Sequence, residues 1–284
     1  MSRVHADAVP DDDWTSRAVW QIPSRTLDTP DDPLRVLILY GSLRQVSYSK
    51  FLAHEFGRLL ARLGADVRIF DPTDLPIKDE GNTGHAKVTE LRDLCVWSEA
   101  NVWVSPEQHG TMTGVFKNQI DWIPLSLGSV RPTQGRTLAL AQVNGGSQSF
   151  NCLNQLRILG RWMRCFTIPN QSSIPKAWTQ FDSEGRLKDT GFRERVVDVA
   201  EELWKMTYLL RPARDQLDDR YSERKEKLEK GRLQSQAEKE AAKDEAAKSV
   251  AAVNGEPGAG TNADKVELYQ PDVGGDQLAP STKV

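Results

Sequence analysis

The feature that most constrains the fold of this chain is a regular alternation of short apolar runs with helix-like stretches between Leu34 and Leu210. The first run, Arg35 to Tyr40, is a continuous β-rich segment of the kind that a strand covered on both faces requires. Apolar residues then recur at helical spacing until Gly64, which follows as a C-cap glycine would. The same periodicities predict further strands at 67–70, 100–105, 137–143 and 164–168, and helices at 47–63, 88–97, around 115–123, 153–163 and 192–210.

Five strands that alternate with helices predict a parallel sheet with right-handed crossovers and helices on both faces. The predicted fold class is therefore doubly wound α/β. Ligands of such sheets bind beyond the carboxyl ends of the strands, near the point where the strand order reverses. The loops after the first, third and fourth predicted strands are therefore where functional residues are expected.

The composition changes outside this segment and predicts four regions. Residues 1–33 form an N-terminal arm with too few apolar groups for a core of its own, and residues 34–212 form the domain. Residues 213–250 form a charged extension with a solvated single helix over 222–248, because Glu and Lys recur there at i,i+4 spacing. Residues 251–284 are poor in large apolar groups and are predicted to be disordered.

Two tryptophans of the arm, Trp14 and Trp20, need an apolar environment. One interpretation is that the arm folds over its own domain. The other is that these side chains anchor in a neighbouring subunit, because aromatic anchors concentrate at protein interfaces. The sequence leaves both alternatives open.

Charge and cysteine content exclude several classes of partner. The net charge of −3 provides no basic field for a phosphate backbone, so nucleic acid is not an expected partner. The three cysteines have long spacings and no C-x-x-C, which is typical of a reducing compartment without disulfides. No apolar run has the length of a signal peptide or membrane span, so we expect a cytoplasmic protein without membrane contact. The four histidines show no metal-ligand spacing, so no metal site is expected.

The loop after the first strand, Gly41 to Ser49, leads directly into a predicted helix. A helix N-terminus offers unpaired N–H groups and a partial positive charge, while serine hydroxyls and the Arg44 guanidinium can add further bonds to an anion. The alternative is that Ser47 or Ser49 only caps the helix and Arg44 is solvated. The loop lacks both G-x-x-x-x-G-K-[ST] and G-x-G-x-x-G, which argues against ATP hydrolysis and a Rossmann dinucleotide site. The combination predicts a cradle for a monophosphate.

Two further loops lie at the same predicted edge. Residues 105–114 are rich in turn-forming and hydrogen-bonding groups and can lie along a flat ring. Residues 144–149 contain small residues that let backbone amides approach a ligand, with Gln148 as an amide group that can bind it. The alternative for this second loop is a tight left-handed turn before a helix.

These motifs occur together in a known family. Gly41-Ser-Leu-Arg44 with Ser47-Tyr-Ser49, then Pro106-Glu107 and Asp121-Trp122, resemble the NADPH-dependent FMN reductases of flavodoxin-like fold. Further blocks are similar to the ArsH group of arsenical-resistance flavoproteins: 109–114, 119–126, 131–135, 145–150, 160–164, 168–173 and 219–225. The resemblance implies a five-stranded sheet of order 2-1-3-4-5.

The resemblance also implies FMN and NADPH as cofactors. The residues implied to bind the FMN phosphate are Ser42, Arg44, Ser47, Tyr48 and Ser49. The residues implied to flank the isoalloxazine are Pro106, Glu107, Gln108, His109, Gly110, Thr111, Asp121, Gly145, Gly146, Ser147 and Gln148. ArsH sequences usually carry Arg where this chain carries Gln108, which removes a charge available for flavin or nicotinamide binding.

The chemistry implied by the resemblance is hydride transfer from NADPH to FMN and then to an acceptor, with ping-pong kinetics. The implied acceptors are quinones, azo dyes, ferric chelates, dioxygen and, for ArsH, trivalent organoarsenicals oxidised to pentavalent forms. No catalytic side chain is expected, because no Ser/His/Asp or Cys/His signature is present. The family implies a homotetramer. A flavodoxin-type electron carrier and a flavin-free regulatory module remain alternatives.

The three cysteines raise the separate question of direct arsenic binding, because trivalent arsenic is a thiol-seeking centre. Cys95 lies on a predicted core face, and Cys152 and Cys165 belong to different elements. Structural cysteines are therefore the preferred interpretation.

Overall fold

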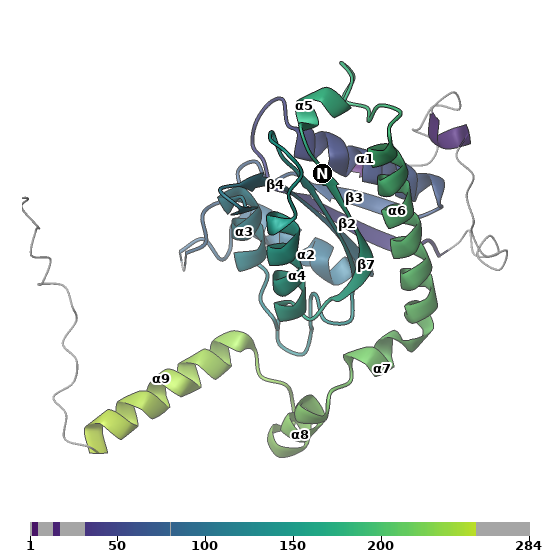
Figure 1. Cartoon of the computed structure of the whole chain (residues 1–284). Helices are drawn as coiled ribbons and strands as arrows, with labels where there is room; N and C mark the ends of the chain where they lie inside the picture. Colours follow the sequence, from purple (N-terminus) through teal and green to yellow (C-terminus); the bar gives the residue numbers. More distant parts are fainter. Residues whose placement is uncertain (1, 5–13, 18–31, 80, 254–284) are drawn as a thin grey trace, which may run out of the picture. The chain divides into compact units, whose positions relative to one another are not determined.

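The computed structural model describes residues 2–4, 14–17, 32–79 and 81–253, and its contacts divide the chain into two units, Met1–Gln236 and Ala237–Val284. The first unit contains a sheet with helices on both faces (Figure 1). The strands are β1 (Ser2–Val4), β2 (Arg35–Tyr40), β3 (Asp66–Phe70), β4 (Ala100–Gln108), β5 (Thr111–Met112), β6 (Thr137–Val143) and β7 (Phe166–Ile174).

The sheet has the order β1-β3-β2-β4-β6-β7, with β5 paired to β4. Within it the five parallel strands β3-β2-β4-β6-β7 reproduce the predicted order 2-1-3-4-5. The prediction of only five strands is wrong in detail. The edge strand β1 pairs antiparallel with β3, and β5 pairs antiparallel with the end of β4. Both are two or three residues long, too short to produce an apolar periodicity that can be read from the sequence.

Two parallel strands run past their predicted carboxyl ends, and both extensions reach the carboxyl edge of the sheet. Strand β4 continues to Gln108, so Pro106 pairs with Val143 instead of lying in a loop. Strand β7 continues to Ile174 through a register shift opposite Leu138 and Leu140. The prediction ended this strand at Ile168 because Pro169 follows, and a proline has no N–H for the ladder. A bulge accommodates the proline and lets pairing resume.

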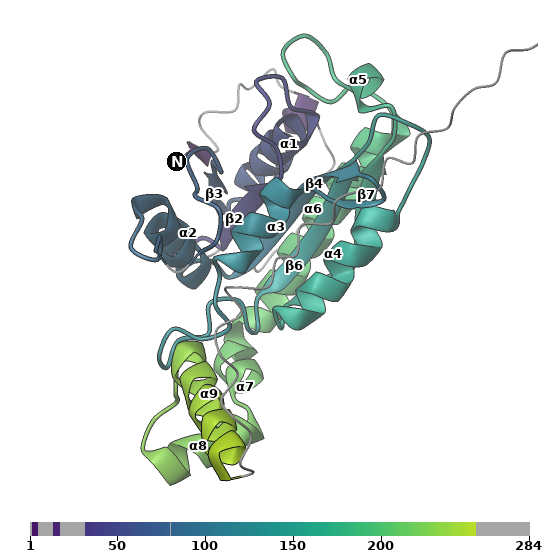
Figure 2. The same ribbon diagram turned by 90° about the vertical axis from the view of Figure 1, so that its left-hand side faces the viewer.

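The helices of the domain are α1 (Tyr48–Arg62), α2 (Ala86–Trp97), α3 (Gly114–Asp121), α4 (Asn151–Trp162), α5 (Ala177–Gln180) and α6 (Gly191–Leu210). Helices α1 and α6 cover one face of the sheet, and α2, α3 and α4 cover the other (Figure 2). Five of the six match predicted helices, and α5 was not predicted.

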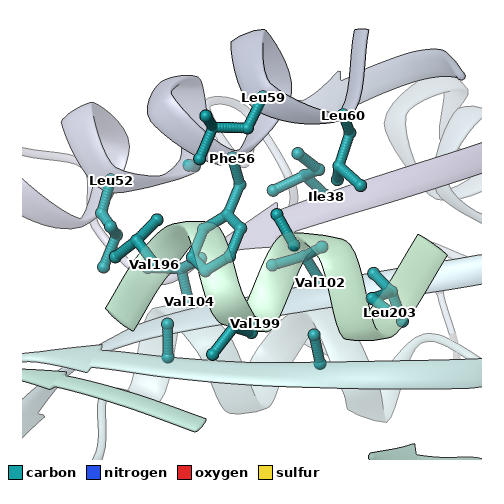
Figure 3. Packing of buried hydrophobic residues seen from close by; sticks show 14 of the residues in the cluster. Ile38, Leu52, Phe56, Leu59, Leu60, Val102, Val104, Val196, Val199 and Leu203 are labelled. Atoms are coloured by element: carbon teal, nitrogen blue, oxygen red, sulfur yellow. The ribbon is translucent and has the colours of Figure 1, made fainter. Parts of the chain in front are cut away.

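Two apolar clusters hold these layers together. Along β2 the side chains alternate, so Ile38 packs under α1 and α6 while Leu37 and Leu39 pack under the helices of the opposite face. Figure 3 shows Phe56 of α1 pointing between the sheet and Val199 of α6. Each such fully buried side chain contributes about 1.5–3 kcal/mol. This packing holds α1 against the sheet, and the N-terminus of α1 lies directly after the loop that follows β2.

The described part of the N-terminal arm includes a short 3-10 helix, η2 (Trp14–Arg17). The half-buried Trp14 ring packs against the cluster beneath α1 and α6, and the Arg193 guanidinium lies 4.4 Å from its centroid. Trp14 therefore packs on its own domain, the first of the two alternatives. Trp20 lies outside the described residues.

The chain after α6 continues through η4 (Arg211–Ala213), α7 (Arg214–Asp218) and α8 (Tyr221–Lys230) to α9 (Gln236–Val253). The predicted single helix over 222–248 is thus two helices, because Gly231 at φ +73° ends α8 in the left-handed conformation of a C-cap glycine. The side chains of residues 241–250 are all exposed. Residues 254–284, most of the predicted tail, lie outside the described residues.

The segment up to α8 is tied to the amino edge of the sheet by buried polar contacts. Glu223 of α8 accepts a hydrogen bond from Arg131 Nε at 3.0 Å and also lies 3.4 Å from Arg164 Nη1. Gln134 Nε2 donates to the Asp218 carbonyl at 2.7 Å. The compact unit accordingly runs on to Gln236. No helix of the described ranges is long and apolar enough to cross a membrane.

Candidate functional site

A cavity of about 910 Å³ lies at the carboxyl edge of the sheet, where the fold class predicts a ligand. Its walls come from the loop after β2, the end of β4, the start of α3, the end of β6 and helix α5. The lining residues are Gly41, Ser42, Leu43, Arg44, Val46, Ser47, Tyr48, Ser49, Pro106, Glu107, Gln108, Thr113, Gly114, Val115, Val143, Asn144, Gly145, Ala177 and Trp178.

Close contacts with α3 fix the start of the loop after β2. The Gly41 N–H donates to the Val104 carbonyl at 3.0 Å, and the Gly41 carbonyl accepts from Thr113 Oγ1 at 2.7 Å. A Cβ atom added to Gly41 would lie 2.7 Å from both Phe116 Cβ and Thr113 Oγ1, which no real Cβ tolerates. Position 41 therefore requires glycine, and the loop leaves the sheet in one defined direction.

The N-terminus of α1 opens into this cavity. Ser47 is the N-cap residue, and its hydroxyl accepts from the Lys50 N–H at 3.1 Å and bonds with the Ser49 hydroxyl at 3.1 Å. The capping alternative is thus real for Ser47, yet the same residue lines the cavity. Tyr48 and Ser49 supply the first backbone N–H groups of α1, which a helix leaves without intrahelical acceptors. These groups and the helix dipole favour an anion at this end.

Arg44 adds a formal positive charge to the same wall. Its side chain is exposed, and within the described residues its guanidinium makes no ion pair. The Ser42 hydroxyl accepts from the Arg44 N–H at 3.2 Å, which gives the loop a tight local turn. The loop therefore presents an uncompensated cation, serine hydroxyls and helix N–H groups on one side of the cavity, a donor set that fits a phosphate monoester.

The end of β4 supplies Pro106, Glu107 and Gln108 to the opposite wall. The Glu107 carboxylate is engaged within the protein: its Oε1 accepts from Ser149 Oγ, and its Oε2 accepts from Gln142 Nε2, both at 2.8 Å. Glu107 Oε2 also lies 3.4 Å from the Cys152 N–H at the start of α4. Glu107 is predicted to flank the ligand. It lines the cavity, and its carboxylate accepts from these protein donors.

His109, Gly110 and Thr111 form the exposed tip of the β4–β5 hairpin. His109 and Gly110 have φ values of +52° and +74°, as a two-residue turn requires, and Gln108 pairs with Thr111 across it. None of the three tip residues lines the cavity, although Gln108 does. Gln108 therefore borders the cavity, and the three residues of the hairpin tip lie outside its lining.

The remaining predicted residues divide in the same way. Gly145 lines the cavity, while Gly146, Ser147 and Gln148 continue the loop after β6 and do not. The Gly146 carbonyl accepts from the Lys176 N–H at 3.0 Å, and Gln148 Nε2 donates to the Ser173 carbonyl at 3.3 Å. Asp121 is the last residue of α3, where its carboxylate pairs with Lys117, and it does not line the cavity.

Sequence reasoning missed one wall, which helix α5 provides. The Ala177 N–H donates to the Asn144 carbonyl at 3.0 Å, and Phe181 just beyond α5 stacks on Tyr48 with ring centroids 5.8 Å apart. Trp178 is 62% exposed and lines the cavity from this anchored backbone. Four residues are too few for a helical period, so the only sequence signal was a tryptophan in a polar stretch.

Burial keeps four titratable groups of the domain neutral, and none of the four lines the cavity. Burial and the nearby Asp71 raise the pKa of Tyr40 above its usual range, so this phenol stays neutral and donates to Asp71 Oδ1 at 3.0 Å. Burial raises the pKa of Cys152 to about 12, and it does the same for Cys95 and Cys165. Burial therefore favours the protonated form of all three thiols.

The described part of the chain contains no group of three His, Cys, Asp or Glu side chains arranged to hold a metal ion. The site thus offers anion binding on one wall, and backbone and apolar surfaces on the others. A flat ring attached to a phosphate chain fits such a cavity.

Comparison with known proteins agrees with this geometry. The model of the family described as NADPH-dependent FMN reductase matches residues 34–179. The NADPH-dependent FMN reductase ArsH of Rhizobium meliloti is 64% identical over 192 residues, which cover 68% of this chain and 80% of that protein. The ArsH of Acidithiobacillus ferrooxidans is 57% identical over 219 residues, covering 76% of this chain and 92% of that protein.

Among solved structures, the flavoenzyme NAD(P)H:(acceptor) oxidoreductase FerB from Paracoccus denitrificans has a TM-score of 0.55. The superposition covers 62% of this chain and 98% of FerB. Its sequence identity is 18%, so this likeness shows the fold alone.

Proposed function

Because this chain belongs to the NADPH-dependent FMN reductase family, and within it to the ArsH group, we propose that its cavity holds FMN during transfer of reducing equivalents from NADPH to small-molecule acceptors. The observation that carries the proposal is the donor set on one wall of the cavity. The N-terminus of α1 and its serine hydroxyls line a space of about 910 Å³ there, together with Arg44, which makes no ion pair with any described residue.

Ser42, Arg44, Ser47, Tyr48 and Ser49 would hold the phosphate, because all five line that wall. Pro106, Gln108 and Gly145 would lie along the ring from the opposite side. The exposed segments 109–111 and 146–148 border this side and remain predicted contacts. For Asp121, no contact among the described residues supports the predicted role.

When bound, FMN would supply the hydride and electron transfer between NADPH and the acceptor, so the proposal requires no nucleophile from the protein. The residues of the chain bind and orient the ring and exclude water from one of its faces. We propose quinones, azo compounds, ferric chelates and dioxygen as acceptors, and trivalent organoarsenicals as substrates oxidised to the pentavalent state. The protonated, mostly buried cysteines argue that arsenic does not act through these thiols.

We also propose that the chain forms a homotetramer. Ile158 and Trp162 lie one turn apart on α4 and are 51% and 62% exposed, and a partner subunit would cover these large apolar side chains. Light scattering tests the assembly state. A mass four times 31.8 kDa is expected, and a monomeric mass would contradict it. The reduced, unpaired cysteines are consistent with a cytoplasmic location.

The phosphate part of the proposal is tested by comparing FMN with riboflavin, which lacks the phosphate. Arg44→Ala removes one charged hydrogen-bond donor, worth about 1.5–3 kcal/mol, so the Kd for FMN should rise roughly 10- to 100-fold. The Kd for riboflavin should not change. Arg224→Ala, at an exposed ion pair on α8, is the matched control and should alter neither value. Equal FMN affinity in the Arg44→Ala and wild-type proteins would refute this assignment.

A further inference from the structure

Helix α4 is not capped by its own N-cap residue. Its N-cap position is Phe150, which makes no side-chain cap bond, and its first turn has no acidic residue. Helices normally begin with Ser, Thr, Asp or Asn, and a negative charge stabilises their N-terminus. The Ser149 hydroxyl accepts from the Asn151 N–H at 3.3 Å, and the next two N–H groups of α4 need acceptors from elsewhere in the chain.

Two side chains from distant strands provide these acceptors. Glu107 Oε2 at the end of β4 accepts from the Cys152 N–H at 3.4 Å. Gln142 Oε1 of β6 accepts from the Leu153 N–H at 2.9 Å, and Gln142 Nε2 donates to Glu107 Oε2 at 2.8 Å. The carboxylate and the buried amide thus act together as the cap of α4.

The same network holds the loop that precedes α4. Ser149 Oγ donates to Glu107 Oε1 at 2.8 Å. The Ser149 carbonyl accepts from Gln142 Nε2 at 2.9 Å and from Ser173 Oγ at 2.6 Å. Ser149 ends the loop whose first residues, Asn144 and Gly145, line the cavity. Glu107 therefore connects three parts of the structure: the end of β4, the loop after β6 and the start of α4.

We propose that Glu107 is a positioning residue, which sets the place of the loop after β6 in the FMN cavity through Ser149, Gln142 and the N-terminus of α4. This inference rests on the proposed function, because the cavity is taken as the FMN site. It differs from the sequence-based interpretation, in which Glu107 itself contacts the flavin. All the protein donors around this carboxylate are backbone or neutral side-chain groups, so the role is carried by hydrogen-bond geometry.

Two substitutions separate positioning from direct contact. In Glu107→Gln, the amide oxygen can accept from Gln142 and the Cys152 N–H, and the amide nitrogen can donate to the Ser149 hydroxyl. The network therefore survives without the charge. Glu107→Ala removes all three bonds. Leu203→Ala, in the fully buried part of α6, is the control for general loss of stability.

Each protein is freed of flavin and titrated with FMN, and the visible circular dichroism of the complex reports the surroundings of the ring. Glu107→Ala should raise the Kd for FMN at least tenfold and change the visible dichroism. Glu107→Gln should stay within about threefold of wild type, and Leu203→Ala should lower Tm without changing the Kd. The proposal would be overturned if Glu107→Gln raised the Kd for FMN as much as Glu107→Ala does. It would also be overturned if the Kd of Glu107→Ala equalled that of the Leu203→Ala control.

Hydrogen exchange of the flavin-free proteins gives a second measurement that does not need the cofactor. Amides of residues 144–153 should exchange faster in Glu107→Ala and at the wild-type rate in Glu107→Gln. Unchanged exchange in Glu107→Ala would overturn the positioning role. Failure of the wild-type protein to bind FMN would instead refute the proposed function, and the exchange rates would still decide the role of Glu107.

Discussion

Glu55 on α1 is fully buried, and it fixes the segment that closes one side of the cavity. Its carboxylate accepts from Arg186 Nε at 2.9 Å and from the Leu187 N–H at 2.7 Å. Leu187 forms a β-bridge with Phe181, the ring that stacks on Tyr48 in the cavity wall. The substitution Glu55→Ala would leave Arg186 without this partner and the Leu187 amide without an acceptor.

Breaking a buried ion pair by removing one partner costs about 3–5 kcal/mol. The Arg186 side chain is 22% exposed, so water can partly replace Glu55, and we expect the lower end, about 3 kcal/mol. For a domain of this size each kcal/mol shifts Tm by about 2–4 °C, which gives a decrease of roughly 6–12 °C.

Thermal unfolding followed by circular dichroism measures this decrease in the flavin-free protein. Lys225→Ala, which removes an exposed pair with Glu229, is the control and should cost less than about 1 kcal/mol. In a double-mutant cycle, the double variant Glu55→Ala/Arg186→Ala should lose clearly less free energy of unfolding than the sum of the losses in the two single variants. Additive losses in the free energy of unfolding would refute the reasoning. So would a decrease in Tm of less than about 2 °C for Glu55→Ala.

Two further predictions concern the cavity and its edge. Gly41→Ala would place a Cβ 2.7 Å from Phe116 Cβ, so overpacking should lower the free energy of unfolding by about 1–3 kcal/mol and weaken FMN binding. The control is Gly191→Ala, whose Cβ would meet nothing within 4 Å. Equal Tm values for the Gly41→Ala and Gly191→Ala proteins would contradict this expectation. Burial alone would raise the pKa of Asp71, but hydrogen bonds from Thr73 and Tyr40 lower this pKa below its usual range. The ionised carboxylate therefore stabilises the fold above about pH 4, and this contribution is lost as the pH falls through the pKa of Asp71 in the folded protein. Asp71→Asn should therefore be less stable than wild type at pH 7 in denaturant titrations, by a difference that shrinks below pH 4; a difference independent of pH would show that the charge is not responsible.

The sequence predicted those elements whose apolar periodicity is long enough to detect. Strands β2 and β6 match their predicted bounds, and the order of the five parallel strands is confirmed. The extension of β7 past Pro169 was not predictable, because pairing with β6 resumes only through a bulge that the partner strand defines. The charge pattern continues at helical spacing on both sides of Gly231, so it does not show that this glycine ends α8.

The candidate site shows the same division. The wall formed by Ser42 to Ser49 could be predicted, because a loop and the helix that follows it are adjacent in sequence. Trp178 could not, since its place depends on a bond between Ala177 and Asn144, which lie in different segments. The hydrogen bonds of the Glu107 carboxylate could not be predicted either, because its donors on β6 and α4 come together only in the folded chain.

The central claim is that this chain carries FMN and reduces it with NADPH. Its most direct test is the absorbance of the FMN-loaded protein in the flavin band during anaerobic addition of NADPH, with NADH added to a parallel sample. The account predicts that NADPH bleaches the band, that NADH does not, and that an acceptor such as a quinone restores the colour. A protein that stays colourless after FMN is supplied, or a flavin band that NADPH leaves unchanged, would contradict it.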